Sequence, residues 1–156
     1  MFRKMRRFKQ EIPEQECIDI LKKQPRGVLA VYGEDGYPYA FPMNYIYMEQ
    51  KLYFHCAKEG HKFDAITVDN RVSFCVMDEG FCNDGEWALN IRSIVIFGKV
   101  KMIDDADKTL KIVHQLGLKY YPTAESVEEE IRKAISRVQV WELSIEHMTG
   151  KLVNES

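Results

Sequence analysis

Segments with two different spacings of apolar residues alternate along this chain. Stretches that are continuously apolar or alternate between apolar and polar residues indicate β-strands, and they fall at residues 27–32, 39–47, 51–55, 71–77, 91–102 and 138–145. Apolar residues three and four positions apart indicate helices, and they fall at residues 13–23, 61–69, 104–118 and 125–135. The pattern therefore predicts six strands and four helices.

The early strands are joined by short connections. Residues 33–36 and 48–50 are turn segments between successive strands, which favours antiparallel hairpins. Strand–helix–strand units do not repeat, so a doubly wound parallel sheet is not indicated. We expect an α+β fold, mainly β, in which six strands form an antiparallel barrel with helices at its periphery. Residues 78–90 contain two glycines and predict an unusually long loop.

Length and composition limit the organisation of the chain. Its 156 residues, 46% of them hydrophobic, suit one core, so we treat residues 1–156 as a single domain. The 22 basic and 24 acidic residues give a net charge of −2, which creates no field favouring nucleic acid or an anionic membrane. No apolar run approaches the roughly 20 residues of a membrane helix. We expect neither a nucleic-acid partner nor a membrane span.

The N-terminus and the cysteines bear on location and metal binding. Residues 1–10 carry five cations but lack the apolar core and cleavage site of a secretory signal. We expect a basic, solvated and partly flexible leader on a cytoplasmic protein. Cys17, Cys56, Cys75 and Cys82 show no Cys-x-x-Cys spacing, so reduced thiols and no metal site are expected.

Three basic or potentially basic side chains, Lys58, His61 and Lys62, surround the start of the helix expected at residues 61–69. Cations there oppose the helix dipole, which favours negative charge at this end. A phosphate would balance them, because the free N–H groups of the first turn also attract an anion and Gly60 lets the backbone approach closely. From spacing alone, a solvated lysine pair on a surface helix is an equally good interpretation.

Several runs of residues together form a more specific pattern. They are Met5-Arg-Arg, Gly27-Val-Leu-Ala, Asp35-Gly-Tyr-Pro-Tyr-Ala-Phe-Pro-Met-Asn-Tyr45, Leu52-Tyr-Phe-His-Cys-Ala-Lys-Glu-Gly-His-Lys62 and Met148-Thr-Gly-Lys151. Over nearly the whole chain, they resemble the nitroimidazole-resistance-like branch of the pyridoxamine phosphate oxidase-like flavoproteins. The run from His55 to Lys62, with the strand from Pro42 to Tyr45 before it, carries most of the resemblance.

This resemblance implies a split β-barrel that binds FMN at the interface of a homodimer, with the phosphate around Lys58, His61 and Lys62. It also implies that Arg92 and Ser93 approach the flavin held mainly by the other subunit. The flavin ring would lie against two strand segments, made of Pro42, Met43, Asn44 and Tyr45 and of His55, Cys56 and Ala57.

Ordinary structural roles stay open at several of these positions. Pro42 cannot donate a ladder hydrogen bond, which favours a barrel rim beside a ligand over the interior of a sheet. Met43 and Tyr45 also suit a packed core, and Asn44 suits a turn. His55 suits the edge of a core as well as a flavin contact.

A flavin carries the redox chemistry itself, so no catalytic acid, base or nucleophile is assigned. The resemblance implies an FMN-dependent oxidoreductase of the nitroreductase-like type. Three alternatives stay open: a non-catalytic flavin-binding protein, a pyridoxamine phosphate oxidase proper, and a haem-binding split barrel with His55, His61 or His147 as axial ligand. The oxidase would need a second cationic pocket, and the C-terminal segment shows only the helix-end charges of residues 132, 133 and 137.

Overall fold

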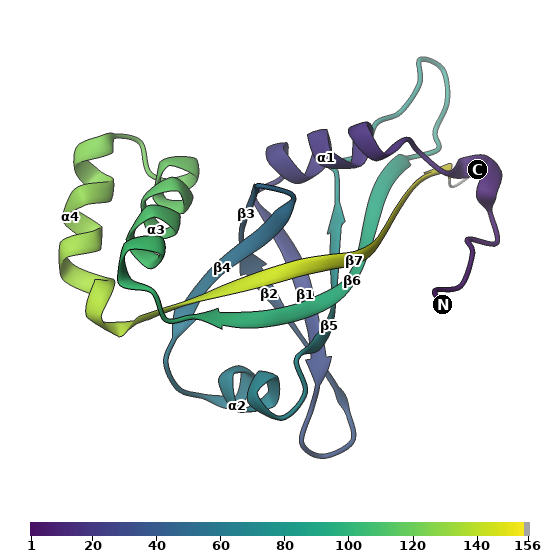
Figure 1. The fold of residues 1–156 in the computed structure, drawn as a ribbon. Coiled ribbons are helices and arrows are strands. Elements are labelled where there is room, and N and C mark those ends of the chain that lie inside the picture. The colour runs from purple at the N-terminus through teal and green to yellow at the C-terminus, as the bar shows by residue number, and fades with distance from the viewer. Residues whose placement is uncertain (155–156) are drawn as a thin grey trace.

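A computed structural model describes residues 1–154 and shows one curled antiparallel sheet with helices around it (Figure 1). The strands are β1 (Arg26–Tyr32), β2 (Pro38–Asn44), β3 (Ile46–Met48), β4 (Lys51–Ala57), β5 (Arg71–Met77), β6 (Asn90–Ile103) and β7 (Val138–Asn154). The α-helices are α1 (Glu14–Lys23), α2 (His61–Val68), α3 (Ala106–Tyr120) and α4 (Ala124–Ala134), with 3-10 turns at Phe8–Gln10 and Ile135–Arg137. The expected α+β, mainly β fold is confirmed.

The order of the strands explains how the sheet closes. It runs β2-β1-β5-β6-β7-β4-β3, so β2 and β3 are the two edge strands. These edges follow each other in the chain with only Tyr45 between them. The sheet must therefore curl until its edges meet, and β2 comes into contact with β4 although the two are not hydrogen-bonded neighbours. We call this line of contact between β2 and β4 the seam.

The break at Tyr45 corrects the prediction of a single strand over residues 39–47, and it raises the strand count from six to seven. Tyr45 is completely buried, and its backbone N–H donates to the Tyr120 hydroxyl at 2.9 Å. Its carbonyl accepts a hydrogen bond from Lys119 Nζ at 2.9 Å. Side chains of α3 thus replace the ladder partners of this residue, which interrupts the strand.

β7 is much longer than the predicted strand over residues 138–145, because it pairs with β6 along the whole length of that strand. The register shifts between Phe97 and Gly98, which lie opposite His147 and Ile145, so Glu146 is the extra residue of a β-bulge. The bulge shifts the inward and outward alternation after Ile145. The pattern of apolar residues therefore weakens where the strand continues.

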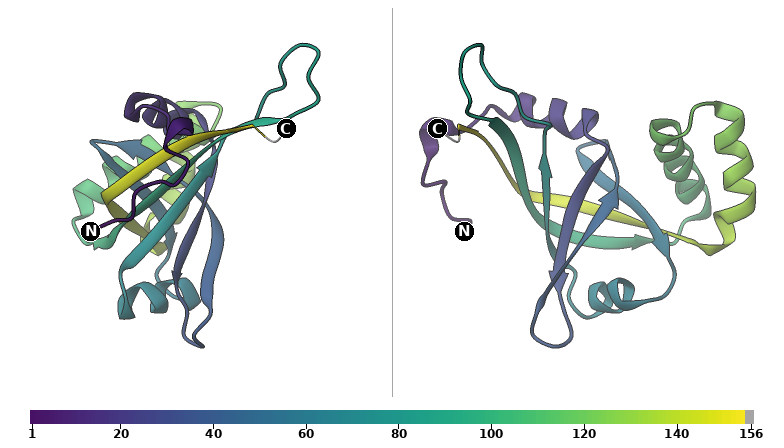
Figure 2. Two further views of the ribbon diagram at one scale, coloured as in Figure 1. Left: turned by 90° about the vertical axis from the view of Figure 1, so that its right-hand side faces the viewer. Right: turned by 180° about the vertical axis from the view of Figure 1, so that it is seen from behind.

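The helices occupy the ends and one side of the barrel. α1 lies at one end and α2 at the other, while α3 and α4 form a pair beside the sheet (Figure 1). Residues 78–89, between β5 and β6, project beyond the body at the α1 end (Figure 2). This loop contains the exposed ring of Trp87 and confirms the predicted long connection.

A buried carboxylate attaches α3 to the sheet. Glu142 on β7 has a side chain only 3% exposed, and its oxygens accept hydrogen bonds from Lys51 (2.8 Å), Lys108 (2.7 Å) and the Tyr53 hydroxyl (3.1 Å). Burial by itself raises the pKa of this carboxyl, but the donated hydrogen bonds and the two positive charges outweigh burial and lower it to about 2.

Candidate functional site

The connection from β4 to α2 is shaped to receive an anion. Gly60 is the N-cap of α2 and has φ +113° and ψ 173°, a backbone conformation that essentially only glycine adopts. No side chain caps the helix, so the N–H groups of its first turn have no side-chain acceptor. A Cβ at Gly60 would meet nothing within 4 Å, so the φ value and not crowding by neighbouring atoms is what favours glycine here. The donors fit a phosphate group.

Lys58, His61 and Lys62, the side chains predicted to surround this position, differ in their surroundings. Lys58 is exposed in the connection, and the His61 ring stacks on the Tyr39 ring with centroids 4.1 Å apart and planes at 9°. Lys62 reaches over β2, where its Nζ lies 3.8 Å from Met43 Sδ and 5.2 Å from the centroid of the Phe41 ring. The carboxylates of residues 59 and 64 are exposed. Lys62 therefore brings a positive charge to the seam.

His55 lies on β4 close to this charge. The His55 side chain is partly exposed, but neighbouring protein atoms displace some of the water around its imidazole and lower its pKa, and the positive charge of Lys62 lowers it further. The lowered pKa favours the neutral imidazole, in which one ring nitrogen donates a hydrogen bond and the other accepts. Such a ring can serve either kind of atom on the polar edge of a ligand.

The predicted flavin-contacting residues alternate between the two faces of their strands. On β4, His55 and Ala57 are exposed, whereas Cys56 is buried and burial raises the pKa of its thiol to about 11. On β2, Pro42 is exposed and lies on an edge strand, where proline is tolerated. Met43 faces inward and is buried. Side chains available to a ligand outside the barrel thus come from alternate positions only.

Asn44 and Tyr45 end β2 differently. The Asn44 Oδ1 accepts a hydrogen bond of 3.0 Å from Arg26 Nε on the neighbouring strand. The Tyr45 ring is in the core, and its hydroxyl has no hydrogen-bond partner. The backbone of Tyr45 is hydrogen-bonded to side chains of α3, so this residue fixes the place where the barrel closes. Its side chain is in the core and is not available to a ligand.

Two residues of the last turn of α3 were not identified from the sequence. Lys119 Nζ donates to the carbonyls of Gln24 and Tyr45, both at 2.9 Å, and lies 3.9 Å from the centroid of the Tyr45 ring. Burial lowers the pKa of Lys119 to about 8. The Tyr120 hydroxyl donates a hydrogen bond of 2.5 Å to the carbonyl oxygen of Pro25. These contacts span 74 to 95 residues along the chain, so no local pattern signals them.

Arg92 and Ser93 point to opposite faces of β6. The Arg92 guanidinium contacts Glu16 Oε1 at 2.7 Å and Asp78 Oδ2 at 3.2 Å, and it lies 4.9 Å from the centroid of the Phe81 ring. It therefore ties β6 to α1 and to the long loop, at the end of the barrel opposite α2 (Figure 1). Ser93 is on the outer face of the sheet, where its cross-strand partner is Lys151.

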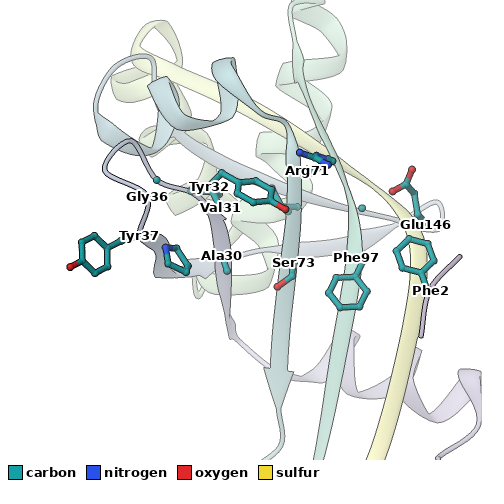
Figure 3. A pocket seen from close by; sticks show the side chains of 14 residues that line it. Phe2, Ala30, Val31, Tyr32, Gly36, Tyr37, Arg71, Ser73, Phe97 and Glu146 are labelled. Atoms are coloured by element: carbon teal, nitrogen blue, oxygen red, sulfur yellow. The ribbon is translucent and has the colours of Figure 1, made fainter. Parts of the chain in front are cut away.

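The outer face of the sheet also carries a pocket of about 520 Å³ that the sequence did not indicate (Figure 3). Its aromatic lining comes from Tyr32 and Tyr37 around the β1–β2 hairpin, Phe97 on β6 and Phe2 of the N-terminal segment. Arg71 on β5 adds a charge, but its guanidinium is paired with Asp69 at 2.6 Å. Glu146 on β7 also lines the pocket, which is therefore assembled from five separate parts of the chain.

Within residues 1–154, no three His, Cys, Asp or Glu side chains are grouped so that they could hold a metal ion. None of the helices in that range has the length and apolar character needed to cross a bilayer. His147, a candidate axial ligand for haem, stacks against the Phe2 ring with centroids 4.8 Å apart.

Comparison with known proteins gives a family and a set of similar folds. The sequence profile of the family described as pyridoxamine 5'-phosphate oxidase matches residues 13–152. No curated protein sequence matches the chain.

Solved structures with the same fold include three with informative descriptions. A protein of Bacteroides thetaiotaomicron assigned to 5-nitroimidazole antibiotic resistance has a TM-score of 0.78 at 22% identity, over 92% of this chain and 87% of that one. An FAD-binding protein of Mesorhizobium loti has a TM-score of 0.67 at 21% identity, over 92% and 97%. The FAD- and haem-binding protein of Mycobacterium smegmatis has a TM-score of 0.74 at 21% identity, over 95% and 74%.

Proposed function

The chain belongs to the pyridoxamine 5'-phosphate oxidase family, and we propose that it is an FMN-binding oxidoreductase that works as a homodimer in the cytoplasm. The observation that carries the proposal is the uncapped N-terminus of α2 at Gly60, with Lys58, His61 and Lys62 around it. FMN ends in a phosphate monoester, which matches these donors in charge and in hydrogen bonding. The flavin-binding proteins among the similar folds support the same cofactor class.

The residues at the seam can position a flat ring beside that phosphate. Pro42 and Ala57 present small or rigid side chains on the outer face, so they leave room for a ring to lie against the strands. The neutral His55 can donate or accept a hydrogen bond at the polar edge of the ring. A bound flavin would supply the redox chemistry, and these groups would orient it. The similar fold assigned to nitroimidazole resistance supports nitro-aromatic compounds as the substrate class.

A comparison of flavins tests the phosphate site. FMN, FAD and riboflavin are titrated into flavin-free protein while flavin fluorescence is recorded. We expect FMN to bind at least about tenfold more tightly than riboflavin, because riboflavin lacks the phosphate and with it the charge-assisted hydrogen bonds. Equal affinity for riboflavin and FMN would show that the phosphate does not contribute to binding, and would overturn the phosphate site at Gly60. Tighter binding of FAD than of FMN would reject FMN as the cofactor.

The proposal of a homodimer is based on the outer face of β2, β1, β5 and β6, which no helix covers (Figure 2, right). Two cross-strand rows on this face consist mostly of apolar or small residues, Pro42–Val28–Cys75–Val95 and Ala40–Ala30–Ser73–Phe97. Val28 is 41% exposed and Phe97 39% exposed. A second copy of the chain would bury these rows and bring its own outer face beside the flavin.

Light scattering after size-exclusion chromatography tests the dimer. We expect twice the mass of one chain for the flavin-loaded protein and the mass of one chain for Val28→Arg, which places a charge in the middle of the face. Leu118→Arg is the matched control, because Leu118 is 44% exposed on α3, away from this face. A monomeric flavin-loaded protein, or equal dimerisation of both variants, would reject this interface.

The free cysteines support the cytoplasmic location. Cys75 and Cys82 are exposed thiols with no disulfide. Such thiols persist in reducing compartments, whereas oxidising compartments favour disulfides.

A further inference from the structure

A cavity of about 510 Å³ lies between α1 and the second half of β7. Five residues between positions 11 and 18, at the start of α1, line one part of it, and Tyr47 and Gln50 near the β3–β4 turn line another. Residues 145–150 of β7 complete the lining. α1 packs against β3 and β7 in this region (Figure 1). The cavity includes no residue of the Gly60 site and none of the two apolar rows on the proposed dimer face.

The charged groups that line this cavity are acidic, apart from the imidazole of His147. Glu11, Glu14 and Glu146 line it, and no Lys or Arg does. Glu146 is paired with Lys99 on β6 at 3.6 Å. Within residues 1–154, Glu11 and Glu14 form no ion pair. Two carboxylates at the cavity therefore have no protein cation to balance them.

The negative charge reaches other groups of the cavity. Burial raises the pKa of the Tyr47 hydroxyl, and the charge of Glu14 raises it further. Burial also raises the pKa of the Cys17 thiol to about 11, and the charges of Glu16, Glu14 and Glu11 add to this shift. Cys17 is only 1% exposed and lines the cavity. The carboxylates thus act on the interior of the cavity as well as on its rim.

The backbone of β7 has no strand partner on one edge where it passes the cavity. β4 pairs with β7 only as far as Ser144. The same edge is next occupied at Gly150, whose carbonyl accepts a hydrogen bond of 3.0 Å from the Ile12 N–H. Residues 145–149 therefore pair with β6 on one side only, and they line the cavity. Backbone carbonyls on such an edge can accept hydrogen bonds from a ligand.

The apolar part of the lining suits a carbon chain. Ile12 and Ile18 line the cavity near α1, and Ile145 and Met148 line it on β7. An ammonium group has three N–H donors and no acceptor, so it suits carboxylates and carbonyls, which only accept. The lining as a whole therefore matches a ligand in which an ammonium group ends an aliphatic chain.

We propose that this cavity binds an aliphatic amine, whose ammonium group contacts the carboxylates of Glu11 and Glu14 and whose carbon chain lies along residues 145–149 of β7. The same carboxylates would repel an anion. A neutral alcohol of the same length would leave them without a counter-charge. The site is additional to the proposed flavin site and does not depend on it.

A titration with butylamine, followed by the amide NMR signals of isotope-labelled protein, tests the site. We expect saturable shifts in residues 145–149 and in the first turn of α1. Butanol has the same chain without the charge and should bind at least about fivefold more weakly, and butylamine binding should weaken with added salt. Equal affinity for the two probes, or no shift in residues 145–149, would overturn the proposal.

Carboxylate variants locate the ammonium group. Glu14→Gln removes one of the two charges, and we expect a loss of about fivefold in affinity for butylamine. Glu125→Gln is the matched control, because Glu125 lies in the first turn of α4 as Glu14 lies in the first turn of α1, but it does not line the cavity. Glu11→Gln repeats the test outside the α-helices. Unchanged affinity in both Glu14→Gln and Glu11→Gln, or the same loss in Glu125→Gln, would overturn the assignment.

The amine site can be tested whether or not the protein binds FMN. Because the cavity has no residue in common with the Gly60 site, the affinity for butylamine should be the same with and without added FMN. Displacement of butylamine by FMN would show that the two ligands compete, and it would overturn the proposal of a separate site.

Discussion

Replacement of the buried carboxylate of Glu142 gives a stability change that can be worked out from the structure. Glu142→Gln keeps the shape of the side chain but removes the charge that Lys51 and Lys108 contact at 2.8 and 2.7 Å. The carboxyl pKa falls from its ordinary value of 4.5 to about 2 in the folded protein. That difference corresponds to roughly 3 kcal/mol of folding free energy at neutral pH.

The pH dependence has a definite sign. A carboxyl whose pKa is lowered by folding stabilises the protein fully above its unfolded value of 4.5, and this contribution disappears as the pH falls towards 2. At pH 3 the difference between the original protein and Glu142→Gln should therefore shrink to roughly 1 kcal/mol. At pH 7 the midpoint of thermal unfolding of Glu142→Gln should be lower by about 5–10 °C.

Urea unfolding followed by circular dichroism at pH 7 and pH 3 measures both quantities. Glu49→Gln is the matched control, since the Glu49–Lys111 pair is more than 60% exposed on both sides and should contribute little. The reasoning would be refuted if Glu142→Gln were as stable as the original protein at pH 7. A loss of stability that is the same at both pH values would show that the carboxylate charge is not the cause.

Three further changes test the seam and the barrel closure. Lys62→Glu should weaken FMN binding by at least about tenfold in a fluorescence titration, because it puts negative charge beside the phosphate, whereas Lys101→Glu should not. Gly60→Ala meets no atom within 4 Å but must adopt φ +113°, so we expect a loss of about 1–3 kcal/mol in urea unfolding and weaker FMN binding. Lys119→Met removes two hydrogen bonds of 2.9 Å to the carbonyls of Gln24 and Tyr45, so stability to urea should fall by about 1–3 kcal/mol; an unchanged midpoint would contradict its role in closing the barrel.

The sequence predicts well what short-range patterns encode. The spacing of apolar residues locates all four α-helices, and β5 has the predicted bounds of Arg71–Met77. The segment from Lys58 to Lys62 joins a strand to a helix as predicted, because a glycine at the cap and cations around it are local features. The contact of this segment with FMN stays a prediction, as do the homodimer and the oxidoreductase activity.

What the sequence does not predict depends on contacts between distant parts of the chain. The break at Tyr45 is caused by side chains about 75 residues later, in the last turn of α3. The guanidinium of Arg92 is held by Glu16, 76 residues earlier, which no spacing along β6 reveals. The outer-face pocket of Figure 3 brings together Phe2, Tyr32 and Phe97, which are far apart in the chain. Each of these features appears only when the curled sheet brings the distant segments together.

The visible absorption spectrum of the purified protein, recorded after incubation with FMN and removal of unbound flavin by desalting, shows directly whether the chain binds FMN. We expect flavin bands to remain in the original protein and to be reduced in Lys62→Glu. A protein that repeatedly loses all flavin on desalting, or that shows a Soret band in its place, would overturn the proposal that it binds FMN.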